Sequence, residues 1–462
     1  MNAKANYIDE KVQELREKLY LVAKKSKTRR FHALFDKVYR MDFLNSAWKQ
    51  VKANKGSAGI DNESIEDIVA LGEEVVLAEI QYRLKNKKYY PMKIKRVYIP
   101  KADGNQRPLG IPTIRDRIVQ TSTKLVIEPI FEADFLNCSF GFRPNRCTHD
   151  ALEEIRKAMN AGYTTVLDAD IKGFFDNINH DKLMDMVFQR INDRKVLKYL
   201  RKWLKCGVLD SGRYYDMEMG TPQGGVISPL LANIYLHEFD KYWAQQTEVK
   251  GKLVRYADDF VILFKTKEES ERGLELVRAK LKELDLELNE DKTSVVDTRE
   301  GKGGFNFLGF HHRMKFSTKY KRHYAQKWPS DKSMNAIRTK IRDTVGKRSV
   351  LPLSLDELVN RVNPILRGWM NYFRYGNSSK KFSQLDMYLH ERFALWWSKK
   401  HQKSGRRWKS DFTWKRFKNS GIQTLTGNIR YWSYESRAQE RRSSESRMGE
   451  NHMYGLMRGW WA

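Results

Sequence analysis

The chain has 462 residues, 40% of them hydrophobic, which is enough to bury a substantial core and to form roughly two to four domains. Its 86 Lys and Arg residues outnumber 57 Asp and Glu residues, and the formal net charge of +29 predicts a polyanionic partner. Aromatic residues (12 Trp, 22 Tyr and 22 Phe) interleave with the basic ones, which favours nucleic acid over an anionic membrane surface because rings stack on bases.

The cysteines and the N-terminus indicate the cellular location. Only three cysteines occur, and no two of them form a CxxC pair, which argues against a disulfide framework and a Cys-rich zinc module. The first 20 residues are charged and amphipathic, and no segment approaches the roughly 18 consecutive apolar residues of a membrane-spanning helix. We therefore expect a cytoplasmic protein without a membrane partner.

The first part of the chain predicts helices, a glycine-rich loop and a basic hairpin. Apolar positions in residues 1–55 recur with helical spacing and predict an N-terminal helical extension. The loop that follows contains Gly59, and such loops are by themselves common connectors. Residues 93–100 then alternate like a strand with a basic face, and a turn links them to Arg107. A hairpin carrying Lys101 and Arg107 can close over a triphosphate, although a solvated basic hairpin gives the same pattern.

Two later loops suit contact with a ligand. Residues 140–144 form an aromatic and basic loop that contains Arg143 and fits contact with a nucleic-acid backbone or base. Residues 220–229 form a glycine-rich loop that opens an apolar helix, and Gln223 offers an amide at its tip. Glycine lets a backbone approach a ligand closely, but an isolated loop of this kind is a weak signal.

Carboxylates follow apolar strands at two places in the chain. The strand that starts at Thr165 ends in Asp170, and the bulky Phe175 follows after a turn. Asp258 and Asp259 lie between two apolar runs, in the pattern of a tight β-hairpin. Like charges so close to buried strands repel each other unless a cation neutralises them, so a divalent metal explains them.

An ordinary Asp-containing turn explains the hairpin equally well when it is considered alone, because Asp is a favoured turn residue. The second acidic site at Asp170 favours the metal. Mg²⁺ binds through one or two carboxylates plus substrate phosphates, and Mn²⁺ suits the same oxygen ligands. Two such ions about 4 Å apart would activate a primer 3′-hydroxyl and stabilise the leaving pyrophosphate, so the arrangement predicts a polymerase palm.

The last third of the chain changes character. The alternation of strands and helices gives way to helical periodicity after about residue 330, which predicts a domain boundary at 315–330. Seven of the twelve Trp residues follow position 395, in a segment rich in Arg and Lys, which favours base stacking there. A small basic domain with Trp in its core is the alternative.

Taken in order, five motifs resemble the reverse transcriptases that bacterial group II introns encode. They occupy residues 99–112, 169–175, 221–230, 256–259 and 307–310. The likeness runs from about Gly56 to the C-terminus. Each motif alone is modest evidence for this family, but five motifs in this order are a specific signature of it.

The resemblance implies an α+β fold of the right-hand polymerase type. Fingers and palm with an antiparallel sheet would occupy residues 56–318, a helical, maturase-X-like thumb 319–400, and a small basic DNA- or RNA-binding region 401–462. Residues 445–459 resemble the ending of the compact class that lacks an endonuclease. Integration would then need a DNA end or nick made by another agent.

The resemblance also implies roles for single residues. Asp170, Asp258 and Asp259 would be catalytic and would bind two Mg²⁺ ions together with Ile171. The residues expected to contact the incoming nucleotide are Lys101, Arg107, Phe175, Gln223 and Lys292. Among these, Phe175 would exclude a 2′-hydroxyl and Lys292 would donate a proton to pyrophosphate. We further expect nucleic-acid contacts from Gly59, Arg143, Arg255 and Tyr256.

The expected partners are intron RNA, an RNA template with a DNA or RNA primer, target DNA and dNTPs. The function would be RNA-directed DNA synthesis, joined to maturase activity in splicing and retrohoming, in the bacterial cytoplasm and at the nucleoid during integration. The sequence leaves open whether the protein is a monomer or a dimer. Two alternatives are a domesticated or defence-associated reverse transcriptase and a non-catalytic RNA-binding splicing factor. The intact aspartates argue against the second.

Overall fold

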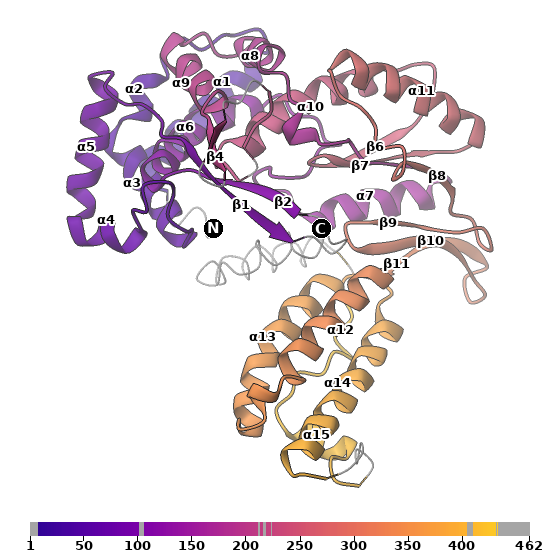
Figure 1. Ribbon diagram of the computed structural model, residues 1–462. Coiled ribbons are helices and arrows are strands. Elements are labelled where there is room, and N and C mark those ends of the chain that lie inside the picture. Colours follow the sequence, from indigo (N-terminus) through magenta and orange to yellow (C-terminus); the bar gives the residue numbers. More distant parts are fainter. Residues whose placement is uncertain are drawn as a thin grey trace.

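The computed structural model describes residues 8–100, 106–210, 213–215, 219–222, 224–403, 410–430 and 432. An α/β body, residues 8–329, is followed by a helical module, residues 330–430, which extends below the body in Figure 1. No helix within these described residues is long and apolar enough to cross a membrane. The observed class is α+β, as predicted.

The N-terminal helices pack around one buried helix of the body. They are α1 (Glu10–Lys25), α2 (Phe35–Val38), α3 (Met41–Ala53), α4 (Ile65–Leu71) and α5 (Glu73–Lys85), and the buried helix is α6 (Ile114–Glu132). The Arg16 side chain of α1 donates to the Leu125 carbonyl at 2.8 Å and pairs with Glu128 at 3.0 Å. The predicted N-terminal extension therefore shares the hydrophobic core of the body instead of standing apart from it.

A small sheet next to these helices contains the predicted basic hairpin. Its strand order is β2-β1-β4-β5, with β1 (Ile94–Pro100), β2 (Gln106–Ile111), β4 (Val208–Asp210) and β5 (Arg213–Tyr215). The antiparallel pairing of Ile99 with Arg107 confirms the hairpin. Helices α8 (His180–Phe188) and α9 (Arg194–Leu204) precede β4.

The central sheet carries the acidic strand ends. Its order is β6-β7-β3-β8, all antiparallel, with β3 (Thr165–Ala169), β6 (Lys252–Tyr256), β7 (Asp259–Phe264) and β8 (Ser294–Asp297). Side chains alternate between two faces. Leu167 and Ile262 pack with helices α10 (Ser228–Gln245) and α11 (Lys267–Glu283). Val166 and Val261 face α7 (Thr148–Asn160) and the helical module. The sheet therefore separates two hydrophobic cores. Figure 1 shows α11 on one side of it and α7 on the other.

A third sheet, of order β11-β10-β9, connects the body to the helical module. Its strands are β9 (Phe305–Phe307), β10 (Phe310–Ser317) and β11 (Arg322–Pro329). Phe310 to Ser317 pair continuously with Arg322 to Pro329, so the predicted boundary at 318/319 falls inside a hairpin. The helices begin only at Asp331, which moves the structural boundary to about residue 330.

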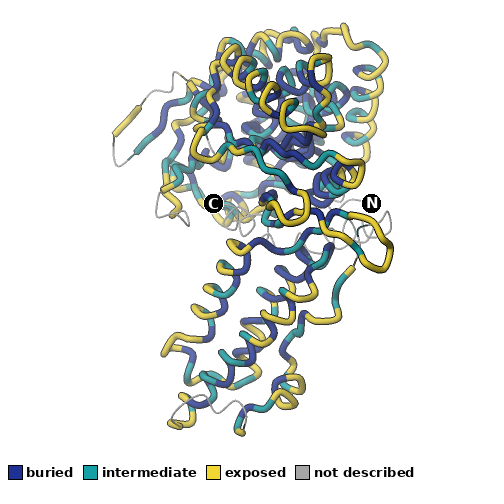
Figure 2. The backbone as a smooth tube through the Cα atoms, turned by 90° about the vertical axis from the view of Figure 1, so that its right-hand side faces the viewer, coloured by how far each residue is buried: buried dark blue, intermediate teal, exposed yellow. Residues whose placement is uncertain are grey.

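The helical module is a small bundle with its own core. It contains α12 (Asp331–Val345), α13 (Leu355–Phe373), α14 (Ser379–Lys400) and α15 (Trp414–Asn419). Figure 2 shows buried stripes along the facing sides of its helices. Phe412 and Phe417 are fully buried with Phe393 of α14, so residues 410–430 belong to this bundle. Trp396 is also buried in it, which favours the core role for that Trp. Residues 445–459 lie outside the described residues.

Candidate active site

The three predicted catalytic aspartates meet at one end of the central sheet. Asp170 follows β3 directly, Asp258 forms the turn between β6 and β7 together with Ala257, and Asp259 is the first residue of β7. Ala169 pairs with Phe260 across β3 and β7, which brings Asp170 beside Asp259. Short strands joined by a two-residue turn position Asp258 and Asp259, as the two apolar runs around them predict.

Two of these carboxylates, Asp258 and Asp259, are disfavoured in their charged form. Enclosure by protein raises the pKa of Asp259 to about 8, and repulsion by Asp258, Asp170 and Asp168 adds to the shift. Burial likewise raises the pKa of Asp258, with a further contribution from Asp170. The Asp259 side chain keeps solvent-exposed surface, so water reduces the penalty without changing its direction. An ion can reach it from the same side.

Nearby donors partly offset this repulsion. Lys292 Nζ lies 3.3 Å from Asp170 Oδ2, and the amide of the Asn289 side chain donates to the same oxygen at 3.2 Å. Attraction to Lys292 lowers the pKa of Asp259, and attraction to Arg107 lowers that of Asp258, but burial and repulsion outweigh both. The site therefore lacks enough positive charge of its own.

The donor set fits a divalent cation. Within the described part of the chain, no three acidic, His or Cys side chains are already gathered as a complete metal-binding group. Mg²⁺ does not require one, because it keeps water and takes one or two carboxylates together with substrate phosphates. The bridge between Ile171 and Leu288 is flanked by hydrogen bonds that use the Asp170 carbonyl and the Lys172 amide. That bridge leaves the Ile171 carbonyl to other partners.

The elements expected to contact the nucleotide converge next to this site. A Cβ added at Gly224 would lie 2.7 Å from the Gly110 carbonyl of β2, and one added at Gly220 would lie 2.8 Å from the Phe175 carbonyl. The amide of Thr221 donates to that Phe175 carbonyl at 2.7 Å. The glycine-rich loop therefore runs between the basic hairpin and the turn that follows Asp170. Lys101 and Gln223 lie outside the described residues.

The structure corrects the expectation for Arg255. We expected its side chain to contact nucleic acid, but the guanidinium is fully buried and pairs with the equally buried Asp240. Burial lowers its pKa, but the attraction and hydrogen bonds of Asp240 outweigh this and raise it. A guanidinium without exposed surface cannot bind a phosphate. Tyr256 is partly exposed at the end of β6, and its contact with nucleic acid stays a prediction.

Arg143 and Gly59 are both buried. The Arg143 guanidinium is 2% exposed, pairs with Glu132 at 2.6 Å and donates to the Ser139 carbonyl at 2.8 Å, so the 140–144 loop turns its cation inward. A Cβ at Gly59 would lie 2.6 Å from Thr113 Cα. That glycine is buried and packs closely against the residue before α6, and its contact with nucleic acid stays a prediction.

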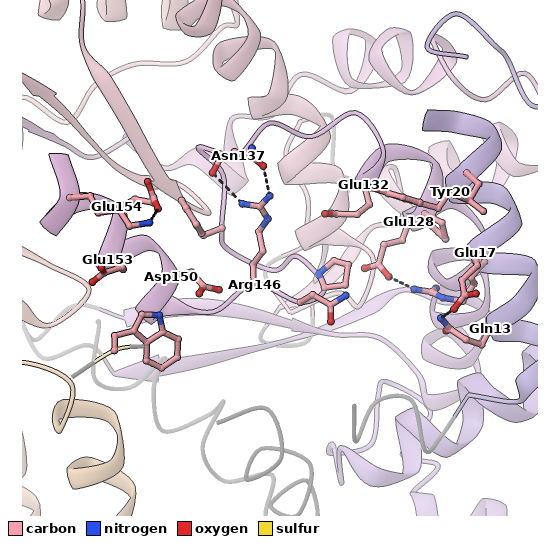
Figure 3. A pocket seen from close by; sticks show the side chains of 18 residues that line it. Gln13, Glu17, Tyr20, Glu128, Glu132, Asn137, Arg146, Asp150, Glu153 and Glu154 are labelled. Carbon is pink, nitrogen blue, oxygen red and sulfur yellow. Dashed lines mark hydrogen bonds and ion pairs between the residues drawn. The ribbon is translucent and has the colours of Figure 1, made fainter. Parts of the chain in front are cut away.

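A large cavity lies elsewhere in the described part of the protein. It has a volume of about 1100 Å³ and is lined by residues of α1, α6, α7 and the loop before α7 (Figure 3). Ion pairs such as Arg16 with Glu128 cross it, and Arg146 donates to the Asn137 side chain at 2.7 Å. None of the three aspartates lines this cavity.

Sequence reasoning missed several residues of the site. Asn289 contacts Asp170 through both its backbone amide, at 2.8 Å, and its side chain. Asp168 lies two residues before Asp170, and burial raises its pKa to about 7, with a further contribution from repulsion by Asp170. The alternation of side chains in β3 puts Asp168 and Asp170 on one face, and this signal was available from the sequence.

Comparisons with known proteins identify the family. Residues 99–312 match the reverse transcriptase (RNA-dependent DNA polymerase) family, and residues 334–417 match the group II intron maturase-specific domain. The protein YkfC of Escherichia coli is 34% identical over 341 residues, which cover 66% of this chain and 88% of that protein. The group II intron-encoded protein LtrA of Lactococcus lactis is 30% identical over 451 residues, covering 78% of this chain and 73% of LtrA.

The two matched regions follow the architecture, since the first ends in the β9–β11 sheet and the second spans α12 to α15. The chain therefore belongs to the group II intron-encoded reverse transcriptases with a maturase-specific domain: it is a divalent-metal-dependent polymerase that binds an RNA template and nucleotides.

Proposed function

We propose that Asp170, Asp258 and Asp259 perform two-metal nucleotidyl transfer, with the Ile171 carbonyl as a further metal ligand. The observation that carries this proposal is the convergence of three mutually repelling carboxylates at one end of β3 and β7 in a protein of net charge +29. Mg²⁺ bound there would activate the primer 3′-hydroxyl and neutralise the negative charge of the leaving pyrophosphate. Mn²⁺ suits the same oxygen ligands.

The residues around the aspartates suit an incoming dNTP. We assign Arg107 to the triphosphate, because a guanidinium binds phosphate oxygens as a fork and this one already acts on Asp258. Phe175 would lie under the sugar and exclude a 2′-hydroxyl. Lys292, whose ammonium is held 3.3 Å from Asp170, would protonate the leaving pyrophosphate. Lys101 and Gln223 would complete this pocket.

We further propose that the molecule is a right-hand polymerase. The α/β body would provide fingers and palm, and the helical module would be the thumb that holds the template and primer. The boundary that we propose between them is residue 330, where the β10–β11 hairpin ends and α12 begins. The basic segment after residue 430 would add contacts to RNA and to target DNA.

The intron RNA is the partner that we propose for the outer surface of the body. Helix α9 buries an apolar face and exposes a row of cations: Arg194, Lys195, Lys198, Arg201 and Lys205. Lys202 lies 3.9 Å from the ring of Tyr90, which is 70% exposed. A basic row beside an exposed ring suits an RNA backbone with unstacked bases. This surface supports a maturase role in splicing and retrohoming.

Primer extension tests the polymerase site. The native protein and the Asp258→Ala/Asp259→Ala variant would be compared on an RNA template annealed to a DNA primer, with dNTPs and Mg²⁺. Asp297→Ala is the matched control, because it removes an acid from the opposite end of the same sheet, where Asp297 pairs with Thr165. We expect extension by the native protein and by the control, and none by the double variant.

RNA binding by all three proteins, measured in parallel, separates loss of chemistry from loss of fold. Extension that persists in the double variant would refute the assignment of the aspartates. Tight RNA binding without extension by any of the three proteins would instead support a non-catalytic splicing factor.

A further inference from the structure

The turn that carries the catalytic aspartates has an unfavourable backbone. Ala257, which immediately precedes Asp258, adopts a φ of +60°. This left-handed region is penalised for any residue with a Cβ, and glycine is the residue that normally occupies it. The favoured two-residue hairpin turns have a positive φ at this position, which costs alanine about 1–2 kcal/mol relative to glycine. Something next to the turn must therefore stabilise the Ala257 conformation.

The buried guanidinium of Arg255 makes that contact. Its Nη1 donates to the Ala257 carbonyl at 2.8 Å and to the Asn233 side-chain oxygen at 3.0 Å. Its Nε donates to Asp240 Oδ1 at 2.8 Å, and Nη2 donates to the other Asp240 oxygen. Both members of the ion pair are fully buried, and Asp240 and Asn233 lie on α10. A rigid helix therefore fixes the guanidinium, and the guanidinium fixes the turn.

The same helix holds a second loop against the turn. The Asn233 side-chain amide donates to the Gly141 carbonyl at 2.9 Å. Gly141 is packed so closely that a Cβ there would lie 2.4 Å from the Ala257 nitrogen. The amide of Phe140 also donates to the Arg255 carbonyl at 2.9 Å. Backbone on one side and guanidinium on the other thus leave the turn little freedom.

We propose that Arg255 is a positioning residue for nucleotidyl transfer, held by Asp240 and Asn233, and that it sets the orientation of Asp258 and Asp259 by fixing the Ala257 carbonyl. The inference rests on the proposed function, in which those aspartates bind the metal ions. A buried ion pair is weak as a source of stability, because desolvation offsets most of the attraction. The Arg255–Asp240 pair also directs hydrogen bonds to the strained turn, which two apolar side chains could not do.

The Arg255→Lys variant tests the proposal. Lysine keeps a positive charge for Asp240, but one ammonium cannot reach Asp240, Asn233 and the Ala257 carbonyl with the geometry of the guanidinium. A displacement of the carboxylates by about 1 Å lowers the rate roughly 100-fold. We expect kcat for single-nucleotide incorporation to fall by about that factor, with the KM for dNTP and the Kd for template and primer within about twofold. Asp240→Asn should change kcat in the same direction but less.

Two controls separate positioning from stability. Arg190 is another buried arginine, paired with Asp134 at 3.0 Å and bound to the Ala23 carbonyl at 2.9 Å, far along the chain from the catalytic turn. Arg190→Lys should lower thermal stability and leave kcat unchanged. Adding Ala257→Gly to Arg255→Lys should restore kcat roughly fivefold to tenfold, because glycine adopts a positive φ without penalty.

The outcomes are distinct. Wild-type kcat in Arg255→Lys, an equal loss of kcat in Arg190→Lys, or no recovery on adding Ala257→Gly would each overturn the positioning role. Full extension by Asp258→Ala/Asp259→Ala would overturn the proposed site and the positioning role with it. Loss of extension in that double variant, together with a low and glycine-restored kcat in Arg255→Lys, supports both.

Discussion

Adding one methyl group at Gly141 tests how tightly the catalytic turn is packed. The Cβ of alanine would lie 2.4 Å from the Ala257 nitrogen, 2.9 Å from the Tyr256 carbonyl carbon and 3.1 Å from Ala257 Cα. Ordinary contact begins at 3.4 Å, so the two segments must separate by 3.4 minus 2.4, or about 1 Å. Every atom in the way belongs to the backbone, so no side chain can rotate aside. Overpacking of this kind costs about 1–3 kcal/mol of stability.

The same displacement should slow the reaction more than it destabilises the fold. A shift of about 1 Å at the reacting groups costs about 100-fold in rate. We expect Gly141→Ala to lower single-turnover incorporation on an RNA template by about this factor, with template binding unchanged. The matched control is Gly303→Ala, whose Cβ would meet its nearest neighbours at 3.6 and 3.8 Å. A wild-type rate in Gly141→Ala would refute the claim that the packing of this loop sets the position of the aspartates.

Two further predictions concern the nucleotide pocket and the core. Phe175→Ala should raise the ratio of ribonucleotide to deoxynucleotide kcat/KM by roughly tenfold or more, and an unchanged ratio would remove Phe175 from the sugar contact. Burial lowers the pKa of His237 to about 4, so the unfolded chain binds more protons below about pH 6.5. Stability should fall by up to about 2 kcal/mol between pH 7 and 5, and thermal unfolding of His237→Gln should lack that part of the loss.

The aspartates were predictable because their signal is local. Strands β3 and β7 are largely continuous apolar runs, and each run borders an acidic residue at one end. Such a pattern fixes which end of each strand bears charge. That Asp170 and Asp259 become neighbours then needs only the pairing of β3 with β7. A divalent metal follows from the chemistry of like charges at one sheet edge.

Arg255 was misread because its partner is distant in sequence. Beside two aspartates in a strongly basic chain, an arginine predicts a phosphate contact. Its actual partner, Asp240, lies 15 residues upstream on α10, and only the packing of that helix on the sheet brings the two together. The Arg143 pair with Glu132 has the same origin. The net charge of the sequence reflects mainly the exposed cations. It does not show which few arginines are buried in ion pairs.

The predicted boundary range of 315–330 reaches the start of the helical module, but the division at 318/319 cuts the β10–β11 hairpin. The prediction relied on the end of the strand and helix alternation, and β11 does not resemble a strand that is buried on one face. Within it Ala325 and Lys327 point inward although one is small and the other charged. The strand exists because β10 offers eight residues of backbone to pair with, which is a tertiary cause.

The end of the sheet that carries the three aspartates gathers features that are each locally unfavourable: a left-handed alanine, a fully buried ion pair and carboxylates that repel one another. They persist because the surroundings are unusually well determined, with Phe260, Ile262 and Phe264 of β7 completely buried beside them. The buried residues of β7 fix the register of the strand, and the strained turn precedes its first residue. Relaxing that turn would favour the folded state and would let the aspartates leave the geometry that a metal and a nucleotide require. Stability and activity are therefore opposed at this site, and the guanidinium of Arg255 is the contact through which the core imposes the active arrangement on the turn.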